Sequence, residues 1–496
     1  MPARLLKVGS SSDGHVSARI VATSEHGVHA YLTLSYCWGG DQTHKTTEKS
    51  LSDTEGKIDI MQLPKTIQDA ITVTVNLGYG FLWVDSVCII QDNELDRTTE
   101  IAKMPEIYSN AVCTIAASSP ANCGRGFLND HDYYTEHAIR IRLRRSEGLV
   151  SDIVHAYPYD HKNFVVEPLA TRAWSLQERL LSTRILEFRR NQVHYLCPST
   201  GQYDKSRSDG WKQDWLPRRQ FKPLGSSNNH HPETLLGWKI PTTEHFRHMW
   251  YSLIEMFTKR DLTFPTDRTL AISGIAQRLA AMDESKSCGT YIVGHWISSD
   301  PHNLMWAREG PNEVKDQQQT RRYPTWAWTS VECQVICIYM VYHQRRSVIE
   351  PIDYAFKLRD ANAPFGDVKS ATITTKGRMI TAECQIHGSF AWKGKLFTKL
   401  AETQIGDAIL DTIPELVDSR FVCEVTLLLT ESSGGRCPDL AGLILVEDPS
   451  HNGRRRFSRL GIWVVTAVYD QRQLEQRSHL LSRLFGESGM DTFDLV

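Results

Sequence analysis

Apolar residues in the first part of the chain follow two periods, one typical of strands and one typical of helices. Leu32, Leu34 and Tyr36 alternate with other residues, which predicts a strand that ends at the pair Gly39–Gly40. Between residues 63 and 78 an apolar stripe recurs at helical spacing, with a proline near its start and a glycine after its end. A run of β-branched residues inside that stretch favours a strand, but the helix is the better prediction.

The same alternation continues over the next thirty residues. Residues 81–90 are almost continuously apolar, as in a strand that is buried on both faces of a parallel sheet. Asp85 interrupts this run, so it must be hydrogen-bonded near the strand end or act on a ligand. Residues 95–108 predict a helix that Pro105 kinks or interrupts. Residues 111–117 predict another buried strand.

A short helix with an unusual face is predicted over residues 172–182. At 3.6 residues per turn, Trp174, Gln177 and Glu178 lie on one face. A helix that only packs against a core would carry apolar residues at these positions. The amide and the carboxylate therefore need a specific partner or a function.

These elements together indicate the fold class. Alternating strands and helices predict a parallel sheet flanked by helices, with right-handed crossovers. Residues 118–168 are predicted to be irregular, and short strands are predicted at 184–189 and 192–197. Three parts of the chain are expected: an α/β domain over 1–200, a helical and loop-rich segment with several tryptophans over 201–330, and a β-rich accessory domain over 331–496.

The second half begins with two predicted helices, 244–260 and 270–281. Four tryptophans follow at short intervals, and such a group is more often a packed core than a ligand cage. They are Trp296, Trp306, Trp326 and Trp328. Strands are then predicted at 335–342, 371–375, 379–385, 422–429, 440–446 and 460–468, with a closing helix at 471–485. The basic cluster 454–456 with Arg459 is interpreted as a solvated hairpin tip.

Composition narrows the classes of function. The chain has 496 residues, 41% of them hydrophobic, and 56 Lys plus Arg against 58 Asp plus Glu, which gives a net charge of -2. Such a charge balance does not favour binding to nucleic acid. We expect no membrane span and a cytoplasmic location, because no apolar run approaches the roughly 20 residues of a spanning helix and no signal peptide is evident.

The eleven cysteines show no CxxC spacing, which argues against a disulfide scaffold or a zinc ribbon and favours a reducing compartment. No metal site is expected. Cys37 and Cys88 are candidate nucleophiles with His44 or His194 as the base, but buried cysteines are usually inert. The stretch 228–233 has metal-ligand residues, yet it is more simply a surface loop.

Four blocks of the sequence carry a resemblance to a known family. They are LSYCWG (34–39), LWVDSVCIIQD (82–92), MPEIYSNA (104–111) and RAWSLQERLLS (172–182). In this order they resemble the successive blocks of the heterokaryon incompatibility (HET) domain of filamentous fungi. The resemblance covers roughly residues 30–200. Ile90 and Pro105 depart from the family pattern.

The resemblance implies a role in fungal non-self recognition or regulated cell death. It also implies a TIR-like, and hence flavodoxin-like, parallel sheet. Some TIR domains cleave NAD at the nicotinamide–ribose bond with one essential glutamate, often in a Trp-x-x-x-Glu context, and Trp174 and Glu178 have this spacing. The strand end at Ser35 and Tyr36 is similar to the first TIR box.

The chemistry of this reaction needs few groups. Cleavage builds oxocarbenium character on the ribose, and nicotinamide leaves as a neutral molecule without a general acid, so one carboxylate suffices. Glu178 is the predicted catalytic group, and NAD would be a substrate, with no cofactor required. Residues predicted to bind the substrate are Ser35, Tyr36, Trp38, Gly39, Asp85, Gln91, Arg172, Trp174 and Gln177.

Alternatively, the same residues have only a structural role. Glu178 would then form an ion pair or a cap with Arg172, Arg179 or a backbone amide, and Trp174 would belong to the core. An enzyme predicts a pocket with Glu178 exposed at its floor near Ser35 and Trp38, whereas Glu178 sealed against an arginine with no cavity nearby favours a non-catalytic interaction module.

Three functional hypotheses therefore remain open. The first is an NAD glycohydrolase, the second is a self-associating signalling module, and the third is a HET-like protein that serves a secondary-metabolite pathway. Three roles remain open for the C-terminal region, which could sense a partner, restrain the N-terminal domain or bind a small molecule, and the sequence does not choose among them.

Overall fold

The computed structural model describes residues 1–10, 15–27, 30–40, 44–128, 139–144, 150–156, 166–190, 193–197, 243–283, 288–297, 301–309, 322–337, 346–361, 363–387, 393–398, 403–411, 420–432, 440–449, 453–465 and 471–496. The chain divides into two compact units, residues 1–238 and 239–496.

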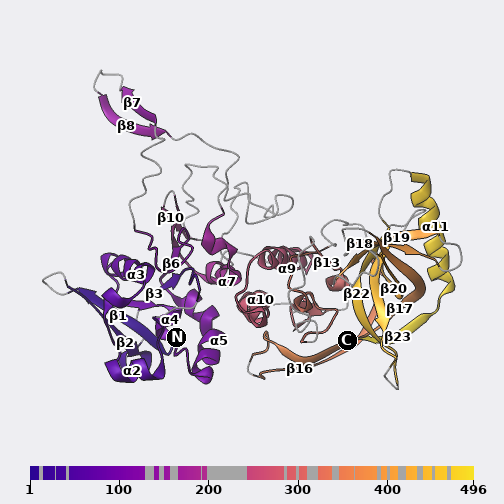
Figure 1. Ribbon diagram of the computed structural model, residues 1–496, viewed down its shortest axis with the longest axis horizontal. Helices are drawn as coiled ribbons and strands as arrows, with labels where there is room; N and C mark the ends of the chain where they lie inside the picture. The colour runs from indigo at the N-terminus through magenta and orange to yellow at the C-terminus, as the bar shows by residue number, and fades with distance from the viewer. Residues whose placement is uncertain are drawn as a thin grey trace. The chain divides into compact units, whose positions relative to one another are not determined.

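The first unit is built on a mixed sheet, whose eight strands within the described ranges follow the order β10-β9-β6-β3-β5-β1-β2-β4 (Figure 1). Its centre is parallel: β3 pairs with β5 and β6, and β6 pairs with β9. These four strands are Leu32–Ser35 (β3), Phe81–Trp83 (β5), Cys113–Ala117 (β6) and Ile185–Phe188 (β9). The predicted α/β class is confirmed.

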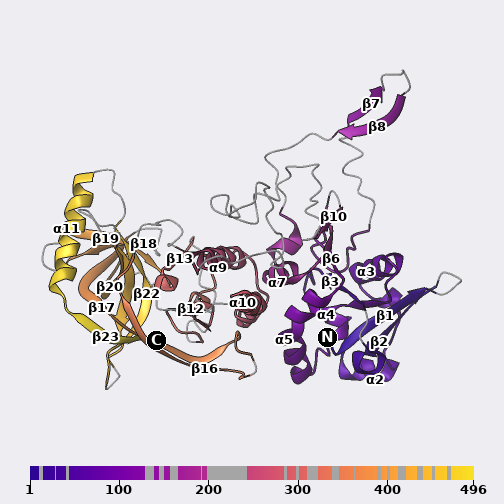
Figure 2. The same ribbon diagram turned by 180° about the vertical axis from the view of Figure 1, so that it is seen from behind.

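Three helices connect the central strands: α3 (Lys65–Asn76), α5 (Glu94–Asn110) and α7 (Ala173–Leu181). The chain goes from β3 through α3 to β5, and then back across β3 through α5 to β6. Because right-handed crossovers in opposite directions place their helices on opposite faces, α3 and α5 lie on different sides of the sheet (Figures 1 and 2). The carboxyl end of β3 is therefore the switch point, where open α/β sheets bind ligands.

Two predictions about these helices have clear outcomes. The run of β-branched residues lies inside helix α3, which ends at residue 76 and buries Ile67, Ala70 and Ile71. Pro105 was expected either to kink or to interrupt this helix. Helix α5 continues through Pro105, so the helix is not interrupted. A proline inside a helix removes one backbone hydrogen bond, which the neighbouring turns tolerate here.

The edges of the sheet are antiparallel: strand β10 confirms the short strand predicted at 192–197, whereas the opposite edge, formed by β1, β2 and β4, was not predicted. The strands are β1 (Arg4–Ser10), β2 (Val16–Ala22), β4 (Lys57–Ile58) and β10 (Val193–Leu196). β1 pairs with β2 and with β5, and β10 pairs with β9. The sheet is therefore mixed, and not the purely parallel sheet that the central alternation suggested. Two short helices, Thr23–His26 (α1) and Glu48–Thr54 (α2), accompany this edge.

Two local predictions were wrong. The apolar run 81–90 is not one strand, because β5 ends at Trp83 and a helical turn, α4 (Asp85–Cys88), follows. The Asp85 side chain explains the break, since its Oδ1 accepts a hydrogen bond of 2.7 Å from the Ser86 backbone N–H. The stretch 118–168 is not wholly irregular, because β7 (Ile139–Arg144) and β8 (Val150–Ala156) form an antiparallel pair.

The second unit begins with the two predicted helices, α9 (Thr243–Thr258) and α10 (Leu270–Met282). Short strands follow at Thr290–Ile292 (β11), His295–Ile297 (β12), Trp306–Arg308 (β13) and Val335–Cys337 (β14). Trp296, Trp306, Trp326 and Trp328 are all buried. The prediction of a tryptophan-rich core is confirmed.

A large sheet fills the rest of this unit. Its members are β15 (Arg346–Ser347), β16 (Glu350–Leu358), β17 (Val368–His387), β18 (Lys393–Phe397), β19 (Gln404–Leu410), β20 (Arg420–Ser432), β21 (Leu440–Glu447), β22 (Arg456–Val464) and β23 (Met490–Leu495). Since β17 pairs with β18 and also with β20, the strands β20-β21-β22-β19-β18-β17 form a closed ring. Helix α11 (Gln471–Glu487) packs on β17 and β19.

The basic cluster near residue 455 divides into two kinds of environment. Arg454 and Arg455 are exposed and pair with Asp494 and Glu447, as a solvated hairpin tip would. Arg459, in contrast, is fully buried, so its assignment to this tip was wrong. Among the described residues, none of the helices is both long and apolar enough to cross a membrane.

Candidate functional site

Ser35, at the carboxyl end of β3, lies against the polar face of α7. The Ser35 hydroxyl donates a hydrogen bond to Glu178 Oε2. Both side chains are buried, with exposed fractions of 4% for Ser35 and 5% for Glu178. On the other side of this helix turn, the Ser182 hydroxyl donates to the Glu178 carbonyl at 2.6 Å and lies 2.6 Å from Thr114 Oγ1. Glu178 is therefore held by residues of the sheet and is withdrawn from solvent.

Residue Tyr36 continues this contact between strand end and helix. Its backbone carbonyl accepts a hydrogen bond from the Arg172 guanidinium, which stands at the N-cap position of α7. Its phenol hydroxyl donates to Ser86 Oγ at 2.9 Å. Tyr36 thus connects β3 to both α7 and the turn that carries Asp85.

Asp85 is the second carboxylate of the cluster, and unlike Glu178 it is only half-buried. Trp38 Nε1 donates to its Oδ2 at 2.9 Å, and Gln91 Nε2 donates to its backbone carbonyl at 3.0 Å. Burial raises the pKa of the Asp85 carboxyl, although the nearby Arg172 charge and the hydrogen bonds from Ser86 and Trp38 act in the opposite direction. This carboxyl is the more accessible acid of the two.

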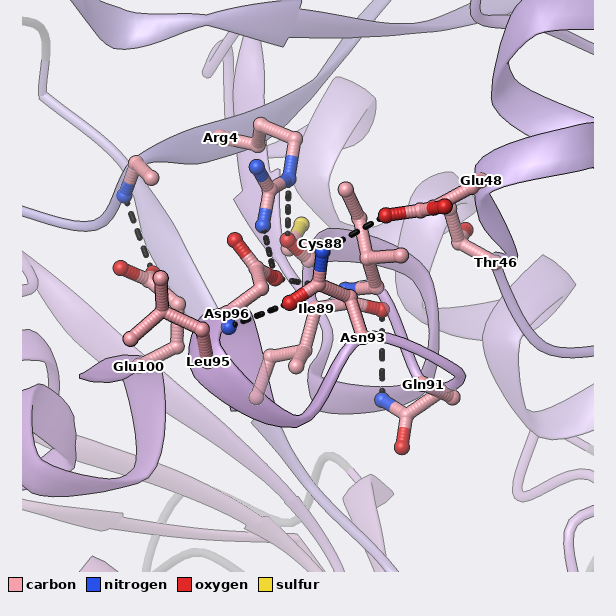
Figure 3. A network of polar contacts seen from close by, with 12 residues as sticks. Arg4, Thr46, Glu48, Cys88, Ile89, Gln91, Asn93, Leu95, Asp96 and Glu100 are labelled. Carbon is pink, nitrogen blue, oxygen red and sulfur yellow. Dashed lines mark hydrogen bonds and ion pairs between the residues drawn. The ribbon is translucent and has the colours of Figure 1, made fainter. Parts of the chain in front are cut away.

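A polar network fixes the loop after α4, which carries Gln91 (Figure 3). Arg4 Nε donates to the Cys88 carbonyl at 2.8 Å, and its Nη2 forms an ion pair with Asp96. Asp96 also accepts a hydrogen bond of 2.8 Å from the Ile90 backbone N–H. Asn93 caps α5 by accepting from the Asp96 N–H at 2.9 Å. Strand β1, which the sequence reading missed, therefore positions part of the predicted site.

Gly39 has a structural requirement of its own. Its φ angle is 76°, and a Cβ atom placed there would lie 2.0 Å from the Asn122 Cβ. The loop after β3 therefore approaches the 121–123 segment too closely for any side chain, and the Cys123 N–H donates to the Trp38 carbonyl at 3.3 Å. The glycine is needed for packing, whether or not a ligand binds.

The structure also contains a small hollow beside Ser35, between one face of strands β6 and β9 and helix α7. Its cavity volume is about 20 Å³, which is room for about one water molecule. Its lining combines hydroxyls, one ion pair and a few apolar groups: Ser35, Thr114, Ala116, Ser118, Leu169, Ala170, Ser175, Arg179, Ile185 and Glu187. Of the ten predicted site residues, only Ser35 lines this hollow.

The ion pair in the lining joins Arg179 of α7 to Glu187 of β9, with Nη1 and Oε2 3.2 Å apart. Arg189 approaches the same Oε2 at 3.3 Å, and the Ser118 hydroxyl donates to Oε1 at 2.6 Å. Burial alone would raise the pKa of the Glu187 carboxyl, but the two arginines and the Ser118 hydroxyl lower it. Sequence reasoning missed Glu187, although a carboxylate inside an apolar strand is the signal that identified Asp85.

The ten predicted site residues thus have different placements. Hydrogen bonds link Ser35 to Glu178, Tyr36 to Arg172, and Trp38 and Gln91 to Asp85. Gly39 lies in the loop that follows β3. Gln177 is buried and Trp174 is half-buried on α7. The predicted exposure of Glu178 at the floor of a pocket is not observed.

The weaker candidates gain little. Burial raises the pKa of Cys37 to about 11 and that of Cys88 to about 12, so both thiols are protonated at neutral pH and are poor nucleophiles. Across the part of the chain that the structure describes, no three His, Cys, Asp or Glu side chains gather as a metal site would require. The stretch 228–233 lies outside the described residues.

The first unit is therefore an α/β domain with a buried polar cluster at the switch point of its sheet. Residues 31–178 match the family model described as Heterokaryon incompatibility protein (HET), so this segment is a HET domain. The match begins just before β3 and ends on Glu178, and it contains every predicted site residue. Comparison with curated proteins and with solved structures found no match to the chain.

Proposed function

We propose that this protein acts in fungal non-self recognition and regulated cell death, with the HET domain as the part that produces the response. The observation that carries the proposal is the family match over residues 31–178, which spans all the blocks that meet at the polar cluster. This cluster joins strand β3, the α4 turn and helix α7 through Ser35, Asp85 and Glu178.

For the way in which the domain acts, the geometry supports a signalling module better than an open active site. Glu178 is 5% exposed and accepts a hydrogen bond from Ser35, so the carboxylate connects the strand end to the helix. A carboxylate that stabilises positive charge on a ribose must contact that ribose, and a buried one has no access to it in this conformation. Self-association or a partner would then carry the signal.

Cleavage of NAD at the nicotinamide–ribose bond is the second candidate. It is favoured by the position of Glu178 at the carboxyl ends of the parallel strands, where ligands of open α/β sheets bind. The hollow beside Ser35 is lined by hydroxyl groups of the kind that bind a sugar, and it would have to widen to admit one. For this reaction, the segment around Ser35 has to move so that Glu178 becomes accessible.

One experiment separates the two. The chain is expressed from an inducible promoter in a filamentous fungus, and growth arrest and cellular NAD are measured together. The variants are Glu178→Gln, which keeps size and hydrogen bonding, and Glu94→Gln, which changes an exposed glutamate of α5 as a control. A module predicts growth arrest without NAD loss, in the parent and in both variants.

An NAD-cleaving enzyme predicts a fall in NAD that precedes arrest and disappears only in Glu178→Gln. Nicotinamide release by the purified chain, measured in parallel, decides whether the protein itself cleaves NAD. Normal growth and unchanged NAD in the strain that expresses the parent chain would refute the proposed role in cell death.

A further inference from the structure

Two cysteines of the second unit lie directly opposite each other on neighbouring strands. Strands β17 and β20 pair antiparallel, with Ala382 opposite Val425, Cys384 opposite Cys423 and Ile386 opposite Phe421. Directly opposite residues point to the same face of a sheet. Both cysteines are free thiols.

The backbone spacing of this pair suits a disulfide bond. Directly opposite residues of an antiparallel pair have Cα atoms about 4.5–5.5 Å apart. Disulfides in proteins join Cα atoms about 4.4–6.8 Å apart, so bond formation at Cys384 and Cys423 needs no rearrangement of the strands. The two side chains are also close enough for each thiol to shift the pKa of the other.

The two thiols differ in a way that suits sequential oxidation. Cys384 is fully buried among the apolar side chains that surround Ala382 and Leu396, whereas Cys423 is partly exposed at the margin of the same cluster. The neighbouring Cys384 thiol lowers the pKa of Cys423, although burial and the Glu383 charge act against it. The accessible thiol is therefore the more reactive one, and the buried thiol stands next to it.

The neighbouring strand leaves room for the buried sulfur. A Cβ atom at Gly394 of β18 would lie 3.2 Å from the Cys384 Sγ, closer than ordinary packing distance. The pair also has a particular place in the topology, because the β17–β20 pairing closes the ring of six strands. A covalent bond there would fasten the seam of that ring.

We propose that Cys384 and Cys423 form a peroxide-responsive dithiol, in which oxidation creates a disulfide across the β17–β20 seam. The Cys423 thiolate attacks one oxygen of hydrogen peroxide, which breaks the O–O bond, gives a sulfenic acid on Cys423 and releases water after protonation. The Cys384 sulfur then attacks the Cys423 sulfur, gives up its proton and displaces the hydroxyl group as a second water. Both sulfurs are oxidised by one electron, and the peroxide takes up two electrons.

The test uses the full chain. The purified, reduced protein is treated with hydrogen peroxide, remaining thiols are alkylated, and peptides are examined by mass spectrometry with and without a reductant. We expect a linked peptide pair that contains Cys384 and Cys423, lighter by two hydrogens than its parts and separated by the reductant. The oxidised protein should also melt several degrees higher than the reduced one.

Two variants and one control refine the result. In Cys384→Ala the sulfenic acid on Cys423 has no partner, so trapping of this group by dimedone should rise several-fold over the parent chain. In Cys423→Ser the linked peptide should disappear and Cys384 should remain reduced. Cys123→Ser changes a partly exposed cysteine of the first unit and should leave the linked peptide unchanged.

Three results would overturn the proposal. The first is oxidation of Cys423 to sulfinic acid in the parent chain without a linked peptide. The second is a link from either cysteine to a different one. The third is oxidation of Cys423 no faster than that of Cys123. Each is read from the parent protein, so none depends on the folding of a variant.

Discussion

The hydroxyl of Ser35 binds the carboxylate of Glu178 across 143 residues of sequence, and both groups are buried. This single bond connects the end of the central strand to the last block of the HET match. It makes Ser35 the residue through which the structural role of Glu178 is best tested. A serine that serves only the substrate would leave the stability of the free protein unaffected.

Replacement of Ser35 by alanine should destabilise the first unit by about 1–3 kcal/mol, because it leaves a buried carboxylate without one of its donors. Urea unfolding followed by circular dichroism measures the change. Ser109→Ala removes an exposed serine hydroxyl of α5 that binds only the carbonyl of Glu106, and should cost about 0.5 kcal/mol or less. Equal costs for the two variants would mean that the Ser35–Glu178 bond contributes little to the fold.

Gly39→Ala should be strongly destabilising, because the new methyl group collides with the Asn122 backbone and side chain. Gly27→Ala is a matched control. Gly27 has a φ angle of 81°, close to the 76° of Gly39, but among the described residues no atom lies within 4 Å of the position that a Cβ atom would take. Gly27→Ala should therefore show only the cost of the backbone conformation, about 1–3 kcal/mol, because the ψ angle of -167° places Gly27 in a region that is almost exclusive to glycine.

The difference between the two melting temperatures measures the close approach of the loop after β3. If both substitutions lower the melting temperature by the same amount, the contact between Gly39 and the 121–123 segment is absent in solution.

Much of the first unit could be predicted, because local patterns and tertiary structure agree there. The alternation of Leu32 and Leu34 indicated β3, and the polar face with Gln177 and Glu178 indicated a helix that meets other polar groups. Asp85 was also recognised as anomalous. Its consequence, a turn that ends β5, could not be inferred, because an apolar run of this length fits a strand equally well.

The parts that were missed depend on contacts between distant residues. Arg459 follows an arginine cluster, and its neighbours suggested an exposed position. Its guanidinium instead pairs with Asp411 with Nε and Oδ2 2.8 Å apart, and stacks on Trp306 at 3.6 Å from the ring centre. The hollow beside Ser35 was missed for the same reason, since Glu187 and Arg179 meet only after the sheet is assembled.

Arg459→Ala should destabilise the second unit by about 3–5 kcal/mol, because it leaves Asp411 as a buried carboxylate without its partner. The guanidinium also donates to the carbonyls of Leu304 and Trp306, so the variant loses several contacts at once. Arg455→Ala is the control, since Arg455 is exposed and pairs with Glu447 on the surface. Thermal unfolding of both variants should show a large shift for the first and almost none for the second.

The double variant Arg459→Met with Asp411→Leu removes both charges together. It should recover much of the lost stability if the unpaired carboxylate is the cause. A double variant as unstable as Arg459→Ala would place the main contribution in the cation–aromatic stack and the two carbonyl contacts.

His295 should make the stability of the second unit depend on pH below neutrality. Burial, helped by the Arg459 charge, lowers the pKa of this imidazole to about 3, and its Nε2 accepts a hydrogen bond of 3.1 Å from the Trp328 N–H. In the unfolded chain the pKa returns to about 6.5. Between these values the unfolded state binds the extra proton, so stability falls as the pH falls from about 6.5 toward 3, by up to about 1.4 kcal/mol for each pH unit.

Urea midpoints measured from pH 7 to pH 4 test this dependence against two variants. His295→Gln keeps an acceptor for Trp328 but cannot take up a proton, so its midpoint should vary less with pH than that of the parent chain. His479→Gln replaces an exposed histidine of α11 and should follow the parent. If His295→Gln loses stability with acid as steeply as the parent does, the protons are taken up at other groups, and His295 is not the residue that makes the second unit acid-sensitive.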